Sequence, residues 1–404
     1  MDQVQPRLRP HLVPVQDAKN PDVVALWDKL RLNSSPVWLS KEQTGWLELL
    51  DGQRSVENLW EEIWSRRNGR VPKRSDFDEL LDQLDQALCL DTPQFRDQVD
   101  APIRPPQCIG CYAGEPTQLR RQLRDFFEGP GGSGRPRATN KNDGQLRAAL
   151  IPHIDYPRGG RTYAHGFKEV VERTNASLFV IIGTSHYSNH RFTLTRKDFE
   201  TPLGVVQTDQ EYIDKLVEHY GPGLFDDEWL AHIPEHSVEL EVVFLQYLYE
   251  QRRPIRIVPL VVGPFWDHVM TQSAPQKGDD VGRMIQALRA VEDKISEPIC
   301  YIISGDLAHI GPKFGDSKWV NRSQLDQSRK LDKELLKHLE KADAHGFFRA
   351  VAREQDARRI CGLPPTFTAL EALQLRQGKV LHYDQYQHPR GHESVSFASV
   401  AFYQ

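Results

Sequence analysis

The stretch Leu178-Phe179-Val180-Ile181-Ile182-Gly183-Thr184-Ser185-His186 decides the fold, because five apolar residues in a row give way to small and polar ones. A short run rich in β-branched residues is typical of a strand that is buried on both faces of a parallel sheet. His186 stands where that burial ends. In an open α/β sheet the carboxyl ends of parallel strands meet at one edge, where ligands bind. The stretch therefore predicts a buried sheet and a site at its edge.

Strand and helix patterns alternate on both sides of this stretch, from residue 146 to residue 404. Further strands are expected at 148–151, 255–262 and 299–303, and a closing pair of strands at 380–386 and 394–403. Helical spacing of apolar residues fills the intervals between them. This alternation predicts an α/β fold, a mixed, mainly parallel sheet flanked by helices, with an antiparallel hairpin added at the end.

The chain is expected to have two folded parts. Residues 1–100 are expected to form a small, mostly helical or winged-helix-like domain, with apolar residues at helical spacing in 56–64 and 75–88. Residues 101–145 read as a linker that holds a short helix and the Gly-rich tract 129–134, which we expect to be a flexible loop. The α/β domain then covers residues 146–404.

Composition excludes several classes of function. The net charge of −5 gives no electrostatic footprint for nucleic acid, and no apolar stretch is long enough to span a membrane. The first residues lack the basic start and apolar run of a signal peptide. Five cysteines in 404 residues do not make a disulfide framework, so a cytoplasmic location is expected.

Histidines follow several of the predicted strands. His153 ends the first strand segment, and His309 closes the segment Ser304-Gly305-Asp306-Leu307-Ala308-His309. Any single histidine among the fifteen is more often structural than functional, but the strand-end setting favours a crevice. Asp306 lies three residues before His309, so it could orient that imidazole for acid/base work. The alternative is that Asp306 caps the following turn.

Two further segments carry chemistry-bearing side chains. His236 opens a helix, where the dipole lowers the pKa of an imidazole and suits metal binding or hydrogen-bond donation; the alternative is a simple cap formed by Glu235 or Ser237. Cys361 precedes Gly-Leu-Pro-Pro, a rigid setting for a thiolate, although a lone cysteine is more often a small buried hydrophobe. The pair Cys108 and Cys111 has no second pair to complete a zinc site.

Six motifs in order give the region from about residue 147 to the end a specific resemblance to the MEMO family, whose bacterial and archaeal members are called AmmeMemoRadiSam system protein B. The motifs are Pro152-His153-Ile154-Asp155-Tyr156, Gly183-Thr184-Ser185-His186, Thr201-Pro202-Leu203-Gly204, Glu235-His236-Ser237-Val238-Glu239, Ser304-Gly305-Asp306-Leu307-Ala308-His309 and Cys361-Gly362. The final Val395-Ser396-Phe397-Ala398-Ser399 resembles the family's closing strand.

The resemblance implies a fold similar to class III extradiol dioxygenases and a metal site that binds iron or copper. Carried over by motif, the metal ligands are His153, His186 and Cys361. Asp306 and His309 would line the same pocket as catalytic residues, with His236 nearby.

The first motif departs from the family's usual Pro-His-Ala-Gly-Tyr. Asp155 replaces the glycine and adds a carboxylate, either as a partner of the site or as another ligand. Arg158 follows where Tyr-Ser-Gly is usual, and it could hold an anionic substrate group. We therefore expect Asp155 and Arg158 to bind substrate.

The N-terminal unit has a looser resemblance to PqqD-like peptide-binding domains, carried by Leu50-Asp51-Gly52-Gln53-Arg54-Ser55-Val56 and by the leucine-rich helix that ends Ala87-Leu88-Cys89-Leu90. That resemblance implies a protein partner for this unit. A helical cap that packs on the sheet is an equal alternative.

Three functions remain open. The first is metal-dependent redox chemistry on a small molecule or peptide, which suits a facial site with open positions. The second is a non-catalytic adaptor that binds a peptide or phosphopeptide in the same crevice. The third is metal-assisted hydrolysis with zinc, in which Asp155 supplies a carboxylate.

Overall fold

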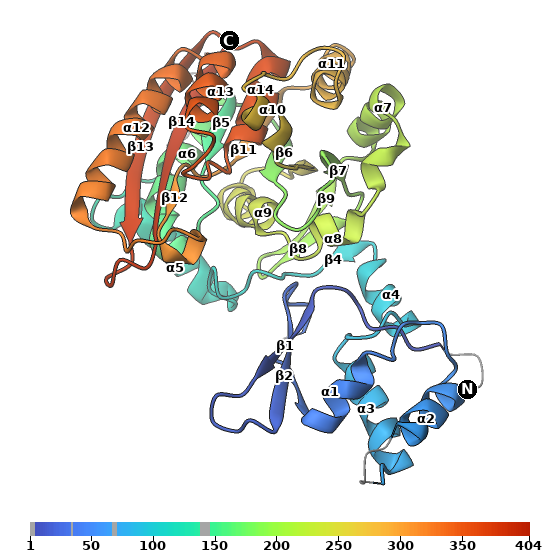
Figure 1. The fold of residues 1–404 in the computed structure, drawn as a ribbon. Helices are drawn as coiled ribbons and strands as arrows, with labels where there is room; N and C mark the ends of the chain where they lie inside the picture. Colours follow the sequence, from blue (N-terminus) through green and yellow to red (C-terminus); the bar gives the residue numbers. More distant parts are fainter. Residues whose placement is uncertain (1–4, 34, 67–70, 138–145) are drawn as a thin grey trace. The chain divides into compact units, whose positions relative to one another are not determined.

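The computed structural model describes residues 5–33, 35–66, 71–137 and 146–404. The chain divides into two compact units, Met1–Ala101 and Pro102–Gln404. Figure 1 shows both as ribbons.

The N-terminal unit combines a small antiparallel sheet with four helices. Its strands pair in the order β1-β2-β3. The elements are β1 (Leu12–Gln16), β2 (Val23–Asp28), β3 (Val37–Ser40), α1 (Lys41–Leu47), α2 (Val56–Ser65), α3 (Arg74–Gln86) and α4 (Pro93–Val99). Ser40 and Ser55 cap α1 and α2 by accepting from backbone N–H groups. Leu59, Phe77 and Leu80 are fully buried in the hydrophobic core of this unit.

The structure adds the strands β1 and β2 to the helices expected in this unit. The sequence hides them because β1 contains Pro14 and has no buried residue, so the alternation that marks a half-buried strand is absent. The helices α2 and α3 follow their predicted ranges closely, since their apolar residues repeat at helical spacing.

The second unit is built on one large mixed sheet with the order β12-β14-β5-β11-β6-β10-β9-β8-β4, to which β13 adds at β14 and β7 at β10. The strands are β4 (Ile103–Arg104), β5 (Leu146–Ile151), β6 (Leu178–Thr184), β7 (Phe192–Leu194), β8 (Asp198–Thr201), β9 (Gly204–Thr208), β10 (Arg256–Val262), β11 (Ile299–Ser304), β12 (His309–Ile310), β13 (Gln377–Gln387) and β14 (Ser394–Tyr403). The central strands β5, β11, β6 and β10 are parallel. The closing strands β13 and β14 form the predicted antiparallel hairpin.

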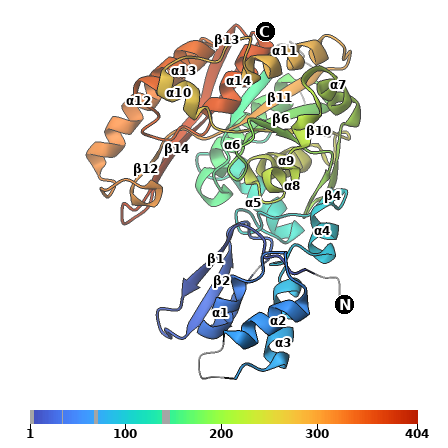
Figure 2. The same cartoon turned by 45° about the vertical axis from the view of Figure 1, so that its right-hand side comes forward.

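Helices cover both faces of this sheet (Figure 2). One face packs on α5 (Pro116–Glu128), α6 (Tyr156–Arg173) and α9 (His236–Tyr249). The other face packs on α7 (Gln210–Tyr220), α11 (Asp280–Glu292), α12 (Arg322–Glu340), α13 (Ala344–Arg353) and α14 (Leu363–Leu373). The short helices are α8 (Glu228–His232), α10 (Trp266–Thr271) and the 3-10 turns Pro222–Phe225 and Pro312–Phe314. Because both faces are covered, all seven residues of β6 are buried, as its unbroken apolar run predicts.

The described part of the expected linker 101–145 is folded into the second unit. β4 pairs with β8, and α5 buries Leu119, Leu123 and Phe127. The Gly-rich tract also forms hydrogen bonds: Gly134 N–H donates to the Phe127 carbonyl at 2.8 Å, and Ser133 Oγ donates to the Ala164 carbonyl at 3.1 Å. The tract is thus a loop that these two hydrogen bonds attach to α5 and α6, and its flexibility stays a prediction; residues 138–145 lie outside the described residues.

Candidate metal centre

The central parallel strands end at one edge of the sheet, and each end carries a side chain of the site. β5 leads to His153, β6 to His186, and β11 to Asp306. His236 begins α9, whose N-terminus reaches the same edge, because Ser237 Oγ donates to the Thr184 carbonyl at 2.8 Å. Topology thus brings together residues more than 150 positions apart.

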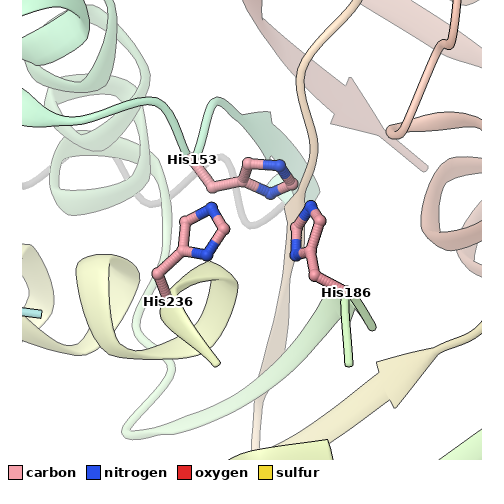
Figure 3. A group of neighbouring side chains, drawn as sticks. All are labelled: His153, His186 and His236. Atoms are coloured by element: carbon pink, nitrogen blue, oxygen red, sulfur yellow. The ribbon is translucent and has the colours of Figure 1, made fainter. Parts of the chain in front are cut away.

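Three imidazoles face one another at this edge (Figure 3). His153, His186 and His236 each offer a ring nitrogen within 4.8 Å of the others. Their ring centroids are 5.1 Å apart for His153–His186 and for His153–His236, and 4.6 Å apart for His186–His236. The sequence predicted His153 and His186 as metal ligands and His236 as a neighbour; the structure places all three in one group.

Glu235 orients two of these imidazoles from a fully buried position. Its Oε2 accepts from the backbone N–H of His186 at 2.8 Å. Its Oε1 lies 2.9 Å from the ring nitrogen Nδ1 of His186 and 3.3 Å from Nδ1 of His236. Burial opposes ionisation of Glu235, but His186 and the backbone N–H of Ser237 outweigh it, and its pKa falls below the usual value. A carboxylate behind ligand imidazoles fixes their tautomer and direction.

Glu235 is the site residue that sequence reasoning missed as a functional group, since it was considered only as a cap. It does cap α9, through Ser237 N–H at 2.9 Å. The available signal was its position beside His236 within the fourth motif.

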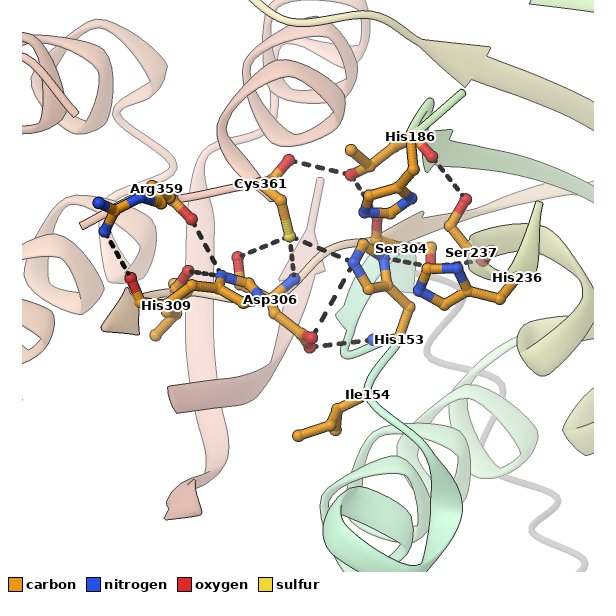
Figure 4. A network of polar contacts seen from close by, with 12 residues as sticks. His153, Ile154, His186, His236, Ser237, Ser304, Asp306, His309, Arg359 and Cys361 are labelled. Carbon is orange, nitrogen blue, oxygen red and sulfur yellow. Dashed lines mark hydrogen bonds and ion pairs between the residues drawn. The ribbon is translucent and has the colours of Figure 1, made fainter. Parts of the chain in front are cut away.

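The second group consists of His153, Asp306 and Cys361, whose ligand atoms also lie within 4.8 Å of one another. Cys361 Sγ is 3.2 Å from His153 Nε2, and Asp306 Oδ1 accepts from the His153 backbone N–H at 3.0 Å (Figure 4). His153 belongs to both groups. Within the described residues, no group of this kind contains both His186 and Cys361.

Burial sets the protonation of the site. It lowers the pKa of His153 well below its usual value, with His186 adding to the effect, and it lowers the pKa of His236 to about 3. For His186 burial acts in the same direction, but the charge of Glu235 outweighs it and raises the pKa. Burial also raises the pKa of Asp306 to about 6 and that of Cys361 well above the usual range.

This donor set fits a metal ion. Two of the three imidazoles are held neutral, which is the form that coordinates a metal. A buried thiol and a carboxyl that resist ionisation by themselves are groups whose charged forms a cation stabilises. Imidazole with thiolate suits zinc, copper or iron rather than magnesium or calcium.

The structure gives His309 different partners from those expected. Its Nδ1 lies 3.0 Å from the Arg359 carbonyl and 3.2 Å from the Leu307 carbonyl, so Nδ1 carries the proton and Nε2 is left as the acceptor. Two backbone carbonyls therefore set its tautomer, while the Asp306 carboxylate bonds to the His153 backbone. Burial lowers the pKa of His309, against the nearby charge of Asp306.

Asp155 and Arg158 bond to each other. Arg158 Nε donates to Asp155 Oδ1 at 2.7 Å, Arg158 Nη1 lies 3.6 Å from Glu393 Oε2, and the guanidinium stacks over the Tyr386 ring. Their role in substrate binding stays a prediction.

Cys108 belongs to a structural network rather than to either histidine group. Its backbone N–H donates to Glu239 Oε1 at 2.9 Å, and the same carboxylate forms a fully buried ion pair with Arg104 at 2.5 Å. Burial raises the pKa of the Cys108 thiol well above its usual value. These bonds attach the segment before the Gly-rich tract to α9, the helix that carries His236.

The fold and the site together define a class of protein: an α/β protein with a histidine-rich centre at the carboxyl edge of its sheet. Residues 104–401 match the family model described as Memo-like protein, and the chain belongs to that family. The predicted resemblance is thereby confirmed for the second unit, whereas a PqqD-like first unit is not confirmed by these comparisons.

Curated relatives carry the same family name. A MEMO1 family protein of Aquifex aeolicus is 26% identical over 381 residues, which cover 92% of this chain and 93% of that protein. One from Methanopyrus kandleri is 28% identical over 298 residues, covering 72% of this chain and 95% of the relative. One from Thermococcus onnurineus is 27% identical over 313 residues, covering 74% of this chain and 99% of the relative.

In the part of the chain that the structure describes, no helix combines the length and the apolar character needed to cross a bilayer.

Proposed function

We propose that this protein is a metal-dependent redox protein that binds iron or copper at His153 together with neighbouring imidazoles and Cys361, and that it acts on a small molecule. The supporting observation is the shared position of His153, which has two imidazoles on one side and a thiol 3.2 Å away on the other. A thiolate beside imidazoles favours copper or iron over hard cations.

The bound metal would supply Lewis-acid and electron-transfer chemistry. Glu235 would hold His186 and His236 in the coordinating tautomer. His309 would accept a proton from substrate at Nε2, because the carbonyls of Leu307 and Arg359 keep its proton on Nδ1. Burial raises the pKa of Asp306 to about 6, and a bound cation would lower it again and favour the carboxylate.

The test is metal loading of the full chain under anaerobic conditions, followed by elemental analysis and absorption spectroscopy. We expect about one ion per chain, with loss of binding in a His153→Ala, His186→Ala double variant. His219→Ala, an exposed histidine of α7, is the control. Cys361→Ser should retain metal and lose the sulfur-to-metal charge-transfer band. Equal metal content in the double variant and the wild type would overturn the proposal.

Zinc-dependent hydrolysis is the second candidate, because three histidines are also a catalytic zinc set. Zinc as the metal retained after purification without added metal, together with no redox change of the loaded protein, would favour it over redox chemistry.

A further inference from the structure

A cavity of about 340 Å³ opens beside the metal centre. His186 and Cys361, one from each ligand group, form part of its lining. The rest comes from the segment after β6, from the start of α10 and from the segment that leads into α14. The volume is at the lower end of the range for small-molecule sites.

One wall of the cavity is apolar and aromatic. Phe265 and Trp266 follow the end of β10, and Val269 and Leu363 extend the same wall. Phe265 is buried and packs edge-on against Phe367, with ring centroids 6.1 Å apart, whereas Trp266 is 55% exposed. A fixed ring beside an exposed ring offers a flat apolar ligand a surface to stack on.

Another part of the lining accepts hydrogen bonds. Thr184 Oγ1 donates to the Cys361 carbonyl at 2.9 Å, and Ser185 Oγ donates to the Ser188 carbonyl at 3.2 Å. Because each hydroxyl hydrogen is used within the protein, the oxygens are left as acceptors. A ligand that donates a hydrogen bond therefore fits this wall better than one that only accepts.

Charge disfavours an anion in the cavity. Arg359, the arginine of the described lining, donates from Nη2 to Asp316 at 2.8 Å and from Nη1 to the carbonyls of His309 and Ala357. Asp356 contributes a carboxylate to the lining, and Glu235 stands behind His186. A carboxylate ligand would meet these acids, and the cations of the described lining are already paired, Arg359 with Asp316 and His186 with Glu235.

The wall that carries Asp356 and Arg359 is held in strained backbone. Gln355, Asp356 and Arg359 have φ values of 52°, 50° and 55°, and none is a glycine. A left-handed conformation is unfavourable for a residue with a side chain, and such strain is typical of binding and catalytic segments. The strained Arg359 places its carbonyl on His309 Nδ1.

We propose that this cavity binds an uncharged aromatic alcohol, with its ring against Phe265 and Trp266 and its hydroxyl directed to the edge formed by His186 and Cys361. Only the statement that this molecule is the substrate rests on the proposed function. Binding itself needs no metal, because the aromatic wall and the acceptors are parts of the protein.

The test measures binding of 4-methylphenol to the metal-free full chain by titration calorimetry, with toluene and 4-methylbenzoate as matched probes. We expect saturable binding of 4-methylphenol and at least about tenfold weaker binding of the other two, because toluene lacks the donor and the benzoate adds a charge. Trp266→Ala should weaken binding of 4-methylphenol about fivefold, since it removes one stacking surface.

Trp319→Ala is the control, because Trp319 is equally exposed at 58% and lies outside the described lining. Equal binding of the three probes, or equal effects of the two tryptophan substitutions, would overturn the inference. Binding of 4-methylphenol without metal uptake would instead refute the proposed function and leave the cavity assignment intact. Metal uptake without binding of 4-methylphenol would refute the cavity assignment and leave the proposed function intact.

Discussion

At the scale of single residues, two buried glutamates on α9 show that position decides charge. Glu239 and Glu241 are both fully buried. Glu239 pairs with Arg104, and this charge, against the effect of burial, lowers its pKa. Glu241 has no hydrogen bond of good geometry on either carboxylate oxygen; burial raises its pKa well above the usual value, and the nearby Ser304 opposes this only in part. The surroundings of Glu239 favour its ionised form, and those of Glu241 favour its protonated form.

The substitution Glu239→Gln should lower the free energy of unfolding by about 3 kcal/mol at pH 7, because it leaves the buried Arg104 charge uncompensated. Glu241→Gln removes a group that must take up a proton on folding at this pH, so it should leave the free energy of unfolding unchanged or raise it. Urea denaturation followed by circular dichroism measures both. Equal losses in the two variants would contradict the assigned charges.

The pH dependence of the Glu241 variant has a defined sign. The folded-state pKa of Glu241 lies above its unfolded value of 4.5, so its contribution is present below pH 4.5 and is lost as the pH rises. Wild type should therefore lose stability relative to Glu241→Gln as the pH rises above 4.5, by up to about 1.4 kcal/mol per pH unit until the folded-state pKa is reached. A difference that stays constant with pH would show that Glu241 is ionised in the folded protein.

At the scale of elements, the end of β11 and the start of α14 touch through two glycines. A Cβ on Gly305 would lie 2.4 Å from Gly362 Cα, and a Cβ on Gly362 would lie 2.7 Å from the Asp306 carbonyl oxygen. Gly362 N–H donates to that same carbonyl at 2.9 Å. This contact holds Asp306 and Cys361 in the same group as His153.

Gly305→Ala should therefore separate the two segments. We expect a loss of about 1–3 kcal/mol in stability from overpacking and about tenfold to a hundredfold weaker metal binding from displaced ligands. Gly278→Ala is the matched control, because its Cβ would meet nothing within 4 Å. Competition with a chelator measures the affinity. Unchanged affinity in Gly305→Ala would show that this contact does not position the ligands.

Elements with a strong pattern could be predicted from the sequence, and contacts between elements could not. The apolar run of β6 and the helical spacing of α3 placed both within about one residue of their observed starts. The helical spacing of apolar residues gives no sign that α12 and α13 are separate helices, which part near Ala342 with its left-handed φ of 49°. The entire helix α14 was missed, because its Leu-Pro-Pro start resembles a break.

The same distinction applies to the site. His153 and His186 could be located from their strand ends, since parallel strands finish at one edge. The orientation of His236 beside these two histidines depends on Glu235. The tautomer of His309 depends on a carbonyl of the strained segment that contains Arg359. Such contacts arise from the packing of distant segments, which no local pattern encodes.

At the scale of the whole molecule, the boundary of the second unit can be tested with two fragments. The contact between Arg104 and Glu239 and the burial of α5 place residues 102–137 within this unit, whereas the sequence pattern alone starts it at 146. A fragment of residues 102–404 keeps every ligand named above. It should unfold cooperatively and bind metal as tightly as the full chain.

A fragment of residues 146–404 should fail to fold. Without α5, the apolar surface that α5 covers becomes exposed, and without Arg104 the carboxylate of Glu239 is buried with no cation to pair with. Since Glu239 lies on the first turn of α9, its unpaired charge would also disturb His236. Thermal unfolding and metal titration of both fragments measure these outcomes. Cooperative unfolding and full metal affinity in 146–404 would show that the preceding segment is only a linker, and that α9 keeps His236 in place without it.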